Sequence, residues 1–169
     1  MSTKPVVSIV MGSDSDLPTF EETANVLREF GVPYELRILS AHRTPATVRQ
    51  YVLQAPQRGV KIFIAGAGGA AHLGGVVAAH TTLPVLGVPM ETKALKGMDS
   101  LLSTVQMPKG VPVGTLAIGK AGAANAGLLA VQILALTNSR LRQQLQRFKR
   151  TQAKGVLVKD RQLRGRECP

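Results

Sequence analysis

Residues 38–45, ILSAHRTP, carry an apolar run directly into the start of a helix. The apolar run covers residues 34–39, and Thr44 followed by Pro45 is typical of a helix beginning, because proline fits the first helical position. Only four residues separate the two segments: Ser40, Ala41, His42 and Arg43. A strand that turns into a helix within so few residues is typical of a βα unit.

The same alternation continues along the chain. Short apolar runs predict strands at residues 6–11, 34–39, 60–65, 84–88 and 114–118. Amphipathic or small-residue segments predict helices at residues 16–30, 45–57, 99–105, 122–137 and 139–154, and a small-residue helix that follows the glycine-rich corner after the third strand and ends near His80. Such alternation predicts an α/β fold, because parallel strands need helical crossovers that cover both faces. We expect a single doubly wound domain with a flavodoxin-like five-stranded parallel sheet, order 2-1-3-4-5, and a C-terminal helix.

The composition is that of a globular protein. Of 169 residues, 44% are apolar and 18% are charged, which fits one domain of ordinary size. The single cysteine, Cys168, cannot form an intramolecular disulfide, which favours a reducing, cytoplasmic location. Residues 65–90 lack Asp, Glu, Lys and Arg, but their glycines, histidines and prolines indicate a buried interior rather than a membrane span.

The net charge of +11 is concentrated at one end of the chain. From Arg140 onward there are ten Lys and Arg residues against two Asp and Glu, whereas the preceding residues carry eleven against eight. We therefore expect a main domain at residues 1–155 and a basic, poorly ordered tail at residues 156–169. A basic tail can bind nucleic acid or an anionic surface, but this tail lacks interleaved aromatic residues, and a nucleic-acid partner is not expected.

Three strand-to-helix corners carry the polar residues. In a doubly wound sheet, ligands bind outside the carboxyl ends of the strands, where the strand order reverses. The corners after the first, second and third strands are therefore predicted to face one cleft. They are GSDSD (residues 12–16), SAHR (residues 40–43) and GAGGAAH (residues 66–72).

The first two corners favour an anionic ligand. The first corner holds four polar residues, Ser13, Asp14, Ser15 and Asp16. One explanation is that they only cap the helix that follows. Because a cap needs fewer polar groups, the alternative is that they bind a ribose phosphate. Arg43 beside a helix N-terminus favours an anion. His42 changes protonation near neutral pH, which suits catalysis, although a surface histidine bonded to a loop carbonyl is the alternative.

The third corner leaves a non-catalytic role open. Residues 66–71, GAGGAA, fit the dinucleotide fingerprint, but they lie in the third βα unit rather than the first. Residues 114–121, GTLAIGKA, are not a P-loop, because Ala121 stands where Ser or Thr must hold magnesium. No metal site is expected, since His72 and His80 are eight residues apart without a supporting cluster.

Five ordered segments resemble one enzyme family. They are MGSDSD (residues 11–16), SAHRTP (40–45), AGAGGAAHL (65–73), PVLGVP (84–89) and GMDSLLSTVQMPKGVPVGTLAIGKAGAANAGLLA (97–130). Over residues 5–150 the chain resembles the N(5)-carboxyaminoimidazole ribonucleotide mutases of de novo purine (IMP) biosynthesis, the catalytic subunit type of phosphoribosylaminoimidazole carboxylase. One departure is Gly74, where the family usually has proline.

The resemblance implies a reaction and a set of residue roles. Such enzymes move a carboxylate from the exocyclic amine to C4 of the imidazole ring, by release and recapture of carbon dioxide, without metal or cofactor. His42 would protonate C4 as the carbamate leaves and remove that proton after recapture. Asp16 would bind ribose hydroxyls. Ser13, Ser15, Ser40 and Arg43 would bind the phosphate or its surroundings, and Ala67, Gly68 and His72 would line the carbon dioxide pocket.

The resemblance also implies a homo-oligomer, with an octamer as the family's form. The apolar helix at residues 121–136 is consistent with assembly, because a helix that is apolar on every side must be covered on every side. No membrane partner is expected. Direct carboxylation of aminoimidazole ribonucleotide by carbon dioxide, as in the animal class, remains the alternative reaction.

Overall fold

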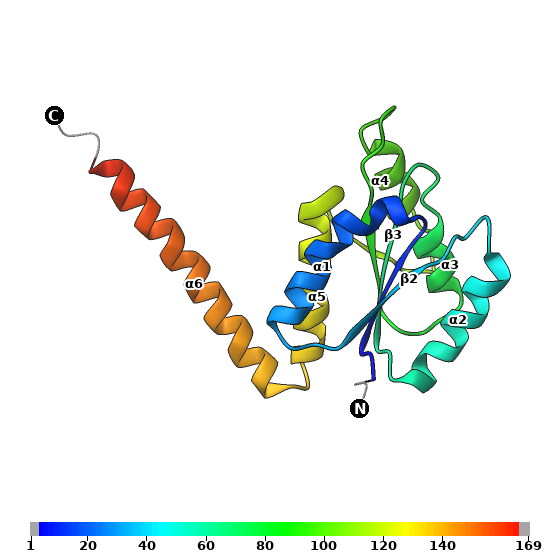
Figure 1. Ribbon diagram of the computed structural model, residues 1–169, viewed down its shortest axis with the longest axis horizontal. Coiled ribbons are helices and arrows are strands. Elements are labelled where there is room, and N and C mark those ends of the chain that lie inside the picture. The colour runs from blue at the N-terminus through cyan, green and yellow to red at the C-terminus, as the bar shows by residue number, and fades with distance from the viewer. Residues whose placement is uncertain (1–3, 166–169) are drawn as a thin grey trace. The chain divides into compact units, whose positions relative to one another are not determined.

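The computed structural model describes residues 4–165 and has an α/β architecture (Figure 1). The strands are β1 (Val7–Met11), β2 (Tyr34–Ile38), β3 (Ile62–Ala67), β4 (Val85–Pro89) and β5 (Gly114–Thr115). The helices are η1 (Asp14–Asp16), α1 (Leu17–Glu29), α2 (Pro45–Arg58), α3 (Leu73–Ala79), α4 (Met98–Val105), α5 (Gly119–Ala135) and α6 (Ser139–Arg164).

The sheet has the predicted topology. All four strand pairs are parallel and the order is β2-β1-β3-β4-β5. Met11 at the end of β1 pairs with Ile38 in β2 and with Gly66 in β3, so the carboxyl ends of these strands lie side by side. The direction of the strand order reverses between β1 and β3, and the corners that follow β1, β2 and β3 surround this point.

Helices cover both faces of the sheet (Figure 1). On one face, α2 and α3 contribute the buried residues Val48, Val52, Leu73 and Val77 to a cluster with sheet residues such as Phe63. On the other face, α1 contacts the first half of α5, where the Thr23 hydroxyl donates a 2.7 Å hydrogen bond to the Ala123 carbonyl. The central strands β1, β3 and β4 are therefore buried on both sides, which explains their continuous apolar sequences, whereas the edge strand β2 is only partly buried.

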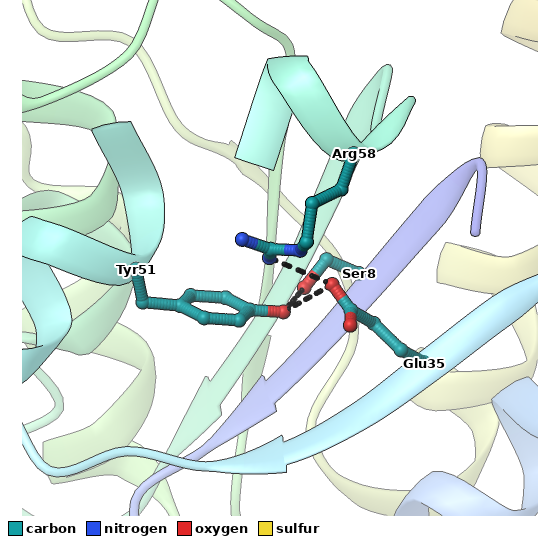
Figure 2. A network of polar contacts seen from close by, with 4 residues as sticks. All are labelled: Ser8, Glu35, Tyr51 and Arg58. Atoms are coloured by element: carbon teal, nitrogen blue, oxygen red, sulfur yellow. Dashed lines mark hydrogen bonds and ion pairs between the residues drawn. The ribbon is translucent and has the colours of Figure 1, made fainter. Parts of the chain in front are cut away.

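A polar network fastens α2 to the sheet (Figure 2). The Tyr51 hydroxyl lies 2.6 Å from the buried Ser8 hydroxyl of β1 and donates a 2.5 Å hydrogen bond to Glu35 of β2. Arg58, at the end of α2, forms a 3.0 Å ion pair with the same carboxylate and stacks over the Tyr51 ring. Because α2 begins just after His42, this network holds the helix that follows the second corner.

Two element boundaries differ from the predictions. The fifth strand covers only Gly114–Thr115 instead of residues 114–118, and α5 begins at Gly119 instead of residue 122. Leu116 still donates its N–H to the Gly87 carbonyl, but the chain then turns at Gly119, whose φ of +72° is left-handed. Glycine adopts this conformation at low cost, so the turn ends the strand early.

The last helix is longer than predicted. It was expected to end near Lys154, but α6 continues to Arg164, so most of the expected tail is helical. Gly155 is the only glycine inside it, and a single glycine costs a helix about 1 kcal/mol. Cys168 lies outside the described residues. The chain forms two compact units that divide between Ala130 and Val131; the expected boundary between residues 155 and 156 stays a prediction.

Candidate active site

The first corner, after β1, combines a capped turn with three residues that line a pocket, Ser13, Ser15 and Asp16. The Ser13 hydroxyl and the Asp14 carboxylate both accept hydrogen bonds from the Ser15 N–H, at 3.3 and 3.1 Å. The Asp14 carboxylate therefore stabilises the backbone of the turn, and Asp14 does not line the pocket. Asp16 stands at the N-cap position of α1, but its side chain makes no capping bond. Its carboxylate remains available to a ligand and lines the pocket together with Ser15.

The Asp16 carboxyl is a perturbed acid. Burial raises its pKa above the ordinary value of 3.8, and the nearby Asp14 charge acts in the same direction. Hydrogen bonds from the Ser13 backbone and the Ser15 hydroxyl act in the opposite direction and are individually smaller effects than burial. A partly desolvated carboxylate with spare acceptor capacity is suited to sugar hydroxyls, which donate hydrogen bonds without bringing a second negative charge.

The second corner, after β2, is a closed hydrogen-bonded loop. The Ser40 hydroxyl accepts bonds from the N–H and the Nε of Arg43, at 3.1 and 3.3 Å. Thr44 stands at the N-cap position of α2, but its hydroxyl makes no capping bond and bonds back to the Ser40 backbone instead. The guanidinium of Arg43 also donates a 2.8 Å bond to the Gly12 carbonyl. Arg43 thus ties the second corner to the first and presents a fixed positive charge.

The third corner, after β3, is built from glycines that have distinct structural reasons. A Cβ on Gly66 would lie 2.4 Å from both the Met90 methyl group and the Phe20 ring, so the strand end has no room for a side chain. Gly69 has a left-handed φ of +68°. Two serines of α4 hold it: the Gly69 N–H donates to the Ser100 hydroxyl, and the Ser103 hydroxyl donates to the Gly69 carbonyl.

The three corners line one pocket of about 420 Å³, a volume in the range of small-molecule sites. All but one of the predicted site residues line this pocket, namely Ser13, Ser15, Asp16, Ser40, His42, Arg43, Ala67 and Gly68. His72 is not among the lining residues but bonds directly to one of them. The predicted convergence of the corners is confirmed, whereas the chemical roles of the residues stay predictions.

His42 and His72 form a pair across the second and third corners. Nε2 of His42 lies 2.9 Å from Nδ1 of His72, and the rings meet edge to face at an interplanar angle of 80°. One of these nitrogens must donate and the other accept, so the tautomers of the two neutral rings are linked. If His72 carries its hydrogen on Nε2, then His42 donates from its own Nε2 and leaves Nδ1 free to accept.

Sequence reasoning missed the residues that follow β4. Met90 and Glu91 line the same pocket, and both also line a second hollow of about 370 Å³. Ser15 and Asp16 are shared as well, so both hollows border on the first corner. The second hollow extends to Lys120 at the start of α5. Glu91 follows the fourth strand, and its place beyond a strand end was the signal that could have identified it.

Comparison with known proteins identifies the family. The family model described as AIR carboxylase matches residues 6–155. The chain belongs to the AIR carboxylase family. Among curated members, the N5-carboxyaminoimidazole ribonucleotide mutase of Aliivibrio fischeri is 58% identical over 151 residues, covering 89% of this chain and 94% of the relative. The mutase of the same name from Bacillus subtilis is 54% identical over 160 residues, covering 95% and 99%.

Solved structures of the AIR carboxylase family have the same fold. PurE from Treponema denticola superimposes with a TM-score of 0.84 at 28% sequence identity, covering 94% of this chain and 98% of that one. A variant of PurE2 from the same organism gives a TM-score of 0.86 at 26% identity, covering 95% and 99%. The fold predicted from the strand-helix alternation is therefore the fold of the family.

Residues 4–165 of this family member contain neither a candidate metal cluster nor a candidate membrane-spanning helix. Within that part of the chain, no group of three or more His, Cys, Asp or Glu side chains is arranged to hold a metal ion. Over the same residues, no helix is both long and apolar enough to span a membrane.

Proposed function

We propose that this protein interconverts N(5)-carboxyaminoimidazole ribonucleotide and 4-carboxy-5-aminoimidazole ribonucleotide in de novo purine biosynthesis. Membership of the AIR carboxylase family and the mutase relatives at 54–58% identity support this activity. The single structural observation that carries it is the pocket that brings His42, Asp16 and Gly68 together from three separate corners. The reaction is an intramolecular transfer, since the carboxylate that leaves nitrogen is the one that carbon receives.

His42 is the proposed proton carrier. As the bond between the exocyclic nitrogen and the carboxylate breaks and releases carbon dioxide, His42 donates a proton to C4 of the ring. His42 then takes one of the two C4 hydrogens back as a proton while the electrons of that C–H bond form the bond from C4 to the same carbon dioxide, and the hydrogen left on C4 moves to the exocyclic nitrogen, which restores the aromatic ring. One imidazole serves both steps because the proton it gives is the proton it recovers. Its bond to His72 holds the ring in place and links its tautomer to a partner outside the reacting atoms.

The first and second corners would hold the sugar phosphate. Arg43 is fixed by Ser40 and Gly12, so its charge is held at the pocket edge without a reorganisation cost when an anion binds. Together with the hydroxyls of Ser13 and Ser15 it offers donors for phosphate. The carboxylate of Asp16 would accept hydrogen bonds from the ribose.

The third corner would retain the released carbon dioxide. Ala67 and Gly68 line the pocket with small groups, and the apolar side chains of Leu73 and Met90 complete this side. Such a surface gives an uncharged linear molecule a dry space beside C4. The hydrogen bond that the Gly69 N–H donates to Ser100 and the one that its carbonyl accepts from Ser103 keep the turn from collapsing into that space. Loss of carbon dioxide from the pocket would turn the transfer into a decarboxylation.

We also infer that the protein works as a homo-oligomer, with the octamer as the expected form, in the cytoplasm. The exposed apolar residues near and on α4 support assembly, because they recur at intervals of three and four: Leu95, Met98, Leu102 and Val105. The polar residues Ser100 and Thr104 of the same helix are buried. Because the apolar stripe of α4 faces outward, we expect a neighbouring subunit to cover it. Light scattering coupled to gel filtration, on the protein and on Leu102→Lys, measures the assembly; a monomer for the unaltered protein would refute it.

The decisive activity test replaces the proton carrier. His42→Asn should lower kcat for interconversion of the two ribonucleotides by about 10²- to 10⁴-fold, the usual contribution of general acid-base catalysis. His80→Asn, at the end of α3, is the matched control and should keep full activity. Activity of His42→Asn near that of the unaltered protein would remove His42 from the mechanism.

Labelled bicarbonate separates the candidate reactions. During interconversion by the unaltered protein, internal transfer leaves the product unlabelled, whereas direct carboxylation of aminoimidazole ribonucleotide introduces the label. A non-catalytic nucleotide-binding module would instead bind a dinucleotide tightly and convert neither ribonucleotide. Calorimetric titration with NAD and with the product ribonucleotide measures that difference.

A further inference from the structure

The surface of α6 carries a regular line of positive charge. Arg140, Arg147, Lys154 and Arg161 follow one another at intervals of seven residues, and all four are exposed. Seven residues are nearly two helical turns, or about 10.5 Å, so these side chains point to the same side of the helix. Arg150 falls within the same face. These five residues are called the basic stripe below; they span about 32 Å of helix.

The stripe lies opposite the buried face of the helix and has no acidic neighbour on α6. The buried residues Leu141 and Leu145 project to the side opposite the stripe, as the helical period of 3.6 residues requires. Asp160 is the sole acidic residue of α6, and it forms an i,i+4 ion pair with Arg164, outside the stripe. Within the described residues of this helix, the charge of the stripe is therefore not neutralised.

We propose that the basic stripe binds nucleic acid through its phosphate backbone. A row of exposed cations without acidic partners is the electrostatic footprint of such binding, and the stripe is about as long as one turn of a duplex. The sequence predicted a helix over residues 139–154 and a basic tail after it, without a nucleic-acid partner; the structure extends that helix to Arg164. The continuous helix arranges the same charges in a line. The proposal is independent of the mutase activity, because no residue of the stripe lines the pocket.

An anionic membrane fits these residues less well. A helix that lies in a membrane surface needs one continuous apolar face beside its cations. The apolar residues Leu141 and Leu145 are buried, and the exposed large apolar residues are Val156, Leu157, Val158 and Leu163. Val156 and Leu163 are seven residues apart and share one side of the helix, whereas Leu157 and Val158 point to other sides, so the exposed apolar face consists of only two residues. The stripe therefore offers five charges beside a small insertion surface, which suits phosphates that remain in water better than a membrane.

The test measures the binding of labelled duplexes to the full-length protein by fluorescence anisotropy. Duplex DNA and duplex RNA of about 20 base pairs, two turns, are separate arms that distinguish the two sources of phosphate backbone. Five phosphate contacts predict a slope of about −4.5 in the logarithm of affinity against that of salt, a loss of roughly 500-fold between 50 and 200 mM salt. Replacing all five stripe residues with Gln should weaken binding at least 50-fold and bring the slope close to zero.

The matched control removes comparable charge elsewhere. Gln in place of Lys4, Arg49, Lys61 and Lys109 lowers the net charge by four at exposed positions of the main body, and should weaken binding less than 5-fold. Interconversion activity of the stripe variant should equal that of the unaltered protein, which shows that it is folded. Equal weakening by both variants, no duplex binding at 50 mM salt, or binding to phosphatidylserine vesicles in place of duplexes would overturn the proposal.

Discussion

Nε2 of His42 and Nδ1 of His72 are 2.9 Å apart, although the two residues belong to corners that follow different strands. This bond leaves the Nδ1 side of the His42 ring for a substrate and fixes the ring plane relative to the glycine corner. A rotamer change of either histidine would break it. Through this pair the third corner can therefore affect His42, the proposed proton carrier, without contacting the substrate ring.

His72→Ala tests this influence. Loss of the partner frees the His42 ring, so we expect kcat to fall by about 10- to 100-fold, less than the effect of replacing a general acid-base residue itself. KM should change little, because the phosphate and ribose contacts are untouched. His72→Asn, whose amide can still accept or donate, should recover part of kcat. Steady-state kinetics in both directions provides the measurement, and an unchanged kcat for His72→Ala would show that the bond has no role.

Asp16→Asn should make the protein more stable at pH 7 and lower its affinity for substrate. Burial raises the pKa of the Asp16 carboxyl, so the folded protein holds this proton more tightly than the unfolded chain. The carboxyl therefore stabilises the fold below pH 3.8, and this contribution is lost as the pH rises through the raised pKa. Asparagine carries no charge to desolvate, so urea denaturation should show the variant to be the more stable protein at pH 7 and the difference to vanish at low pH.

The control for this variant is Asp14→Asn. Asn keeps the oxygen that accepts the Ser15 N–H, and Asp14 does not line the pocket. Its activity should stay within a few-fold of the unaltered enzyme, whereas Asp16→Asn should lose substrate affinity. Equal stability of Asp16→Asn and the unaltered protein across the whole pH range would contradict the assignment of a desolvated carboxylate.

Tyr51→Phe should lower the free energy of unfolding and change how that free energy depends on pH above pH 10. Removing the hydroxyl leaves the buried Ser8 without its partner, at a cost of about 1–3 kcal/mol in the free energy of unfolding. Burial and the bond to Glu35 raise the pKa of Tyr51 to about 12. The neutral phenol therefore stabilises the fold fully below pH 10, and this contribution is lost as the pH rises through 12.

The measurement is the free energy of unfolding from pH 8 to pH 12. The unaltered protein should lose stability more steeply than Tyr51→Phe above pH 10, by up to about 3 kcal/mol for a shift of two pKa units. Tyr34→Phe is the control, because Tyr34 lies in β2 and bonds to an exposed arginine instead. Parallel curves for Tyr51→Phe and the unaltered protein would show that Tyr51 does not titrate differently in the fold.

Two glycine substitutions should have opposite signs. Gly66→Ala places a methyl group 2.4 Å from the Phe20 ring and the Met90 methyl, and overpacking of this kind costs about 1–3 kcal/mol. Gly74→Ala, in the first turn of α3, meets only ordinary contacts at 3.5 Å or more. It should stabilise the protein by about 0.5–1 kcal/mol, because alanine loses less entropy in a helix. Thermal unfolding compares both, and a tolerated Gly66→Ala would show that the core around β3 can adjust.

The strand order and the meeting of the corners could be predicted because both follow from local patterns joined to one topological rule. Each of the first three strands ends in a polar or glycine-rich corner, and parallel connection then determines where those corners lie. The pairing of His42 with His72 needed side-chain positions that no spacing contains. The early end of β5 depends on a left-handed Gly119, and the place of Glu91 beside Lys120 depends on a neighbouring helix that the sequence alone does not position.

The missing side chain at Gly66 has a consequence for redesign. The Met90 methyl group fills this space, and Met90 also lines the pocket. One residue therefore contributes both to the pocket wall and to the packing around β3. A larger heterocycle cannot be accommodated by trimming the pocket wall at Met90 alone, because that change would open a void against Phe20. Variants for bulkier ligands should therefore combine a substitution at Met90 with a compensating one at Phe20. Gly66 thus limits which substitutions this fold accepts.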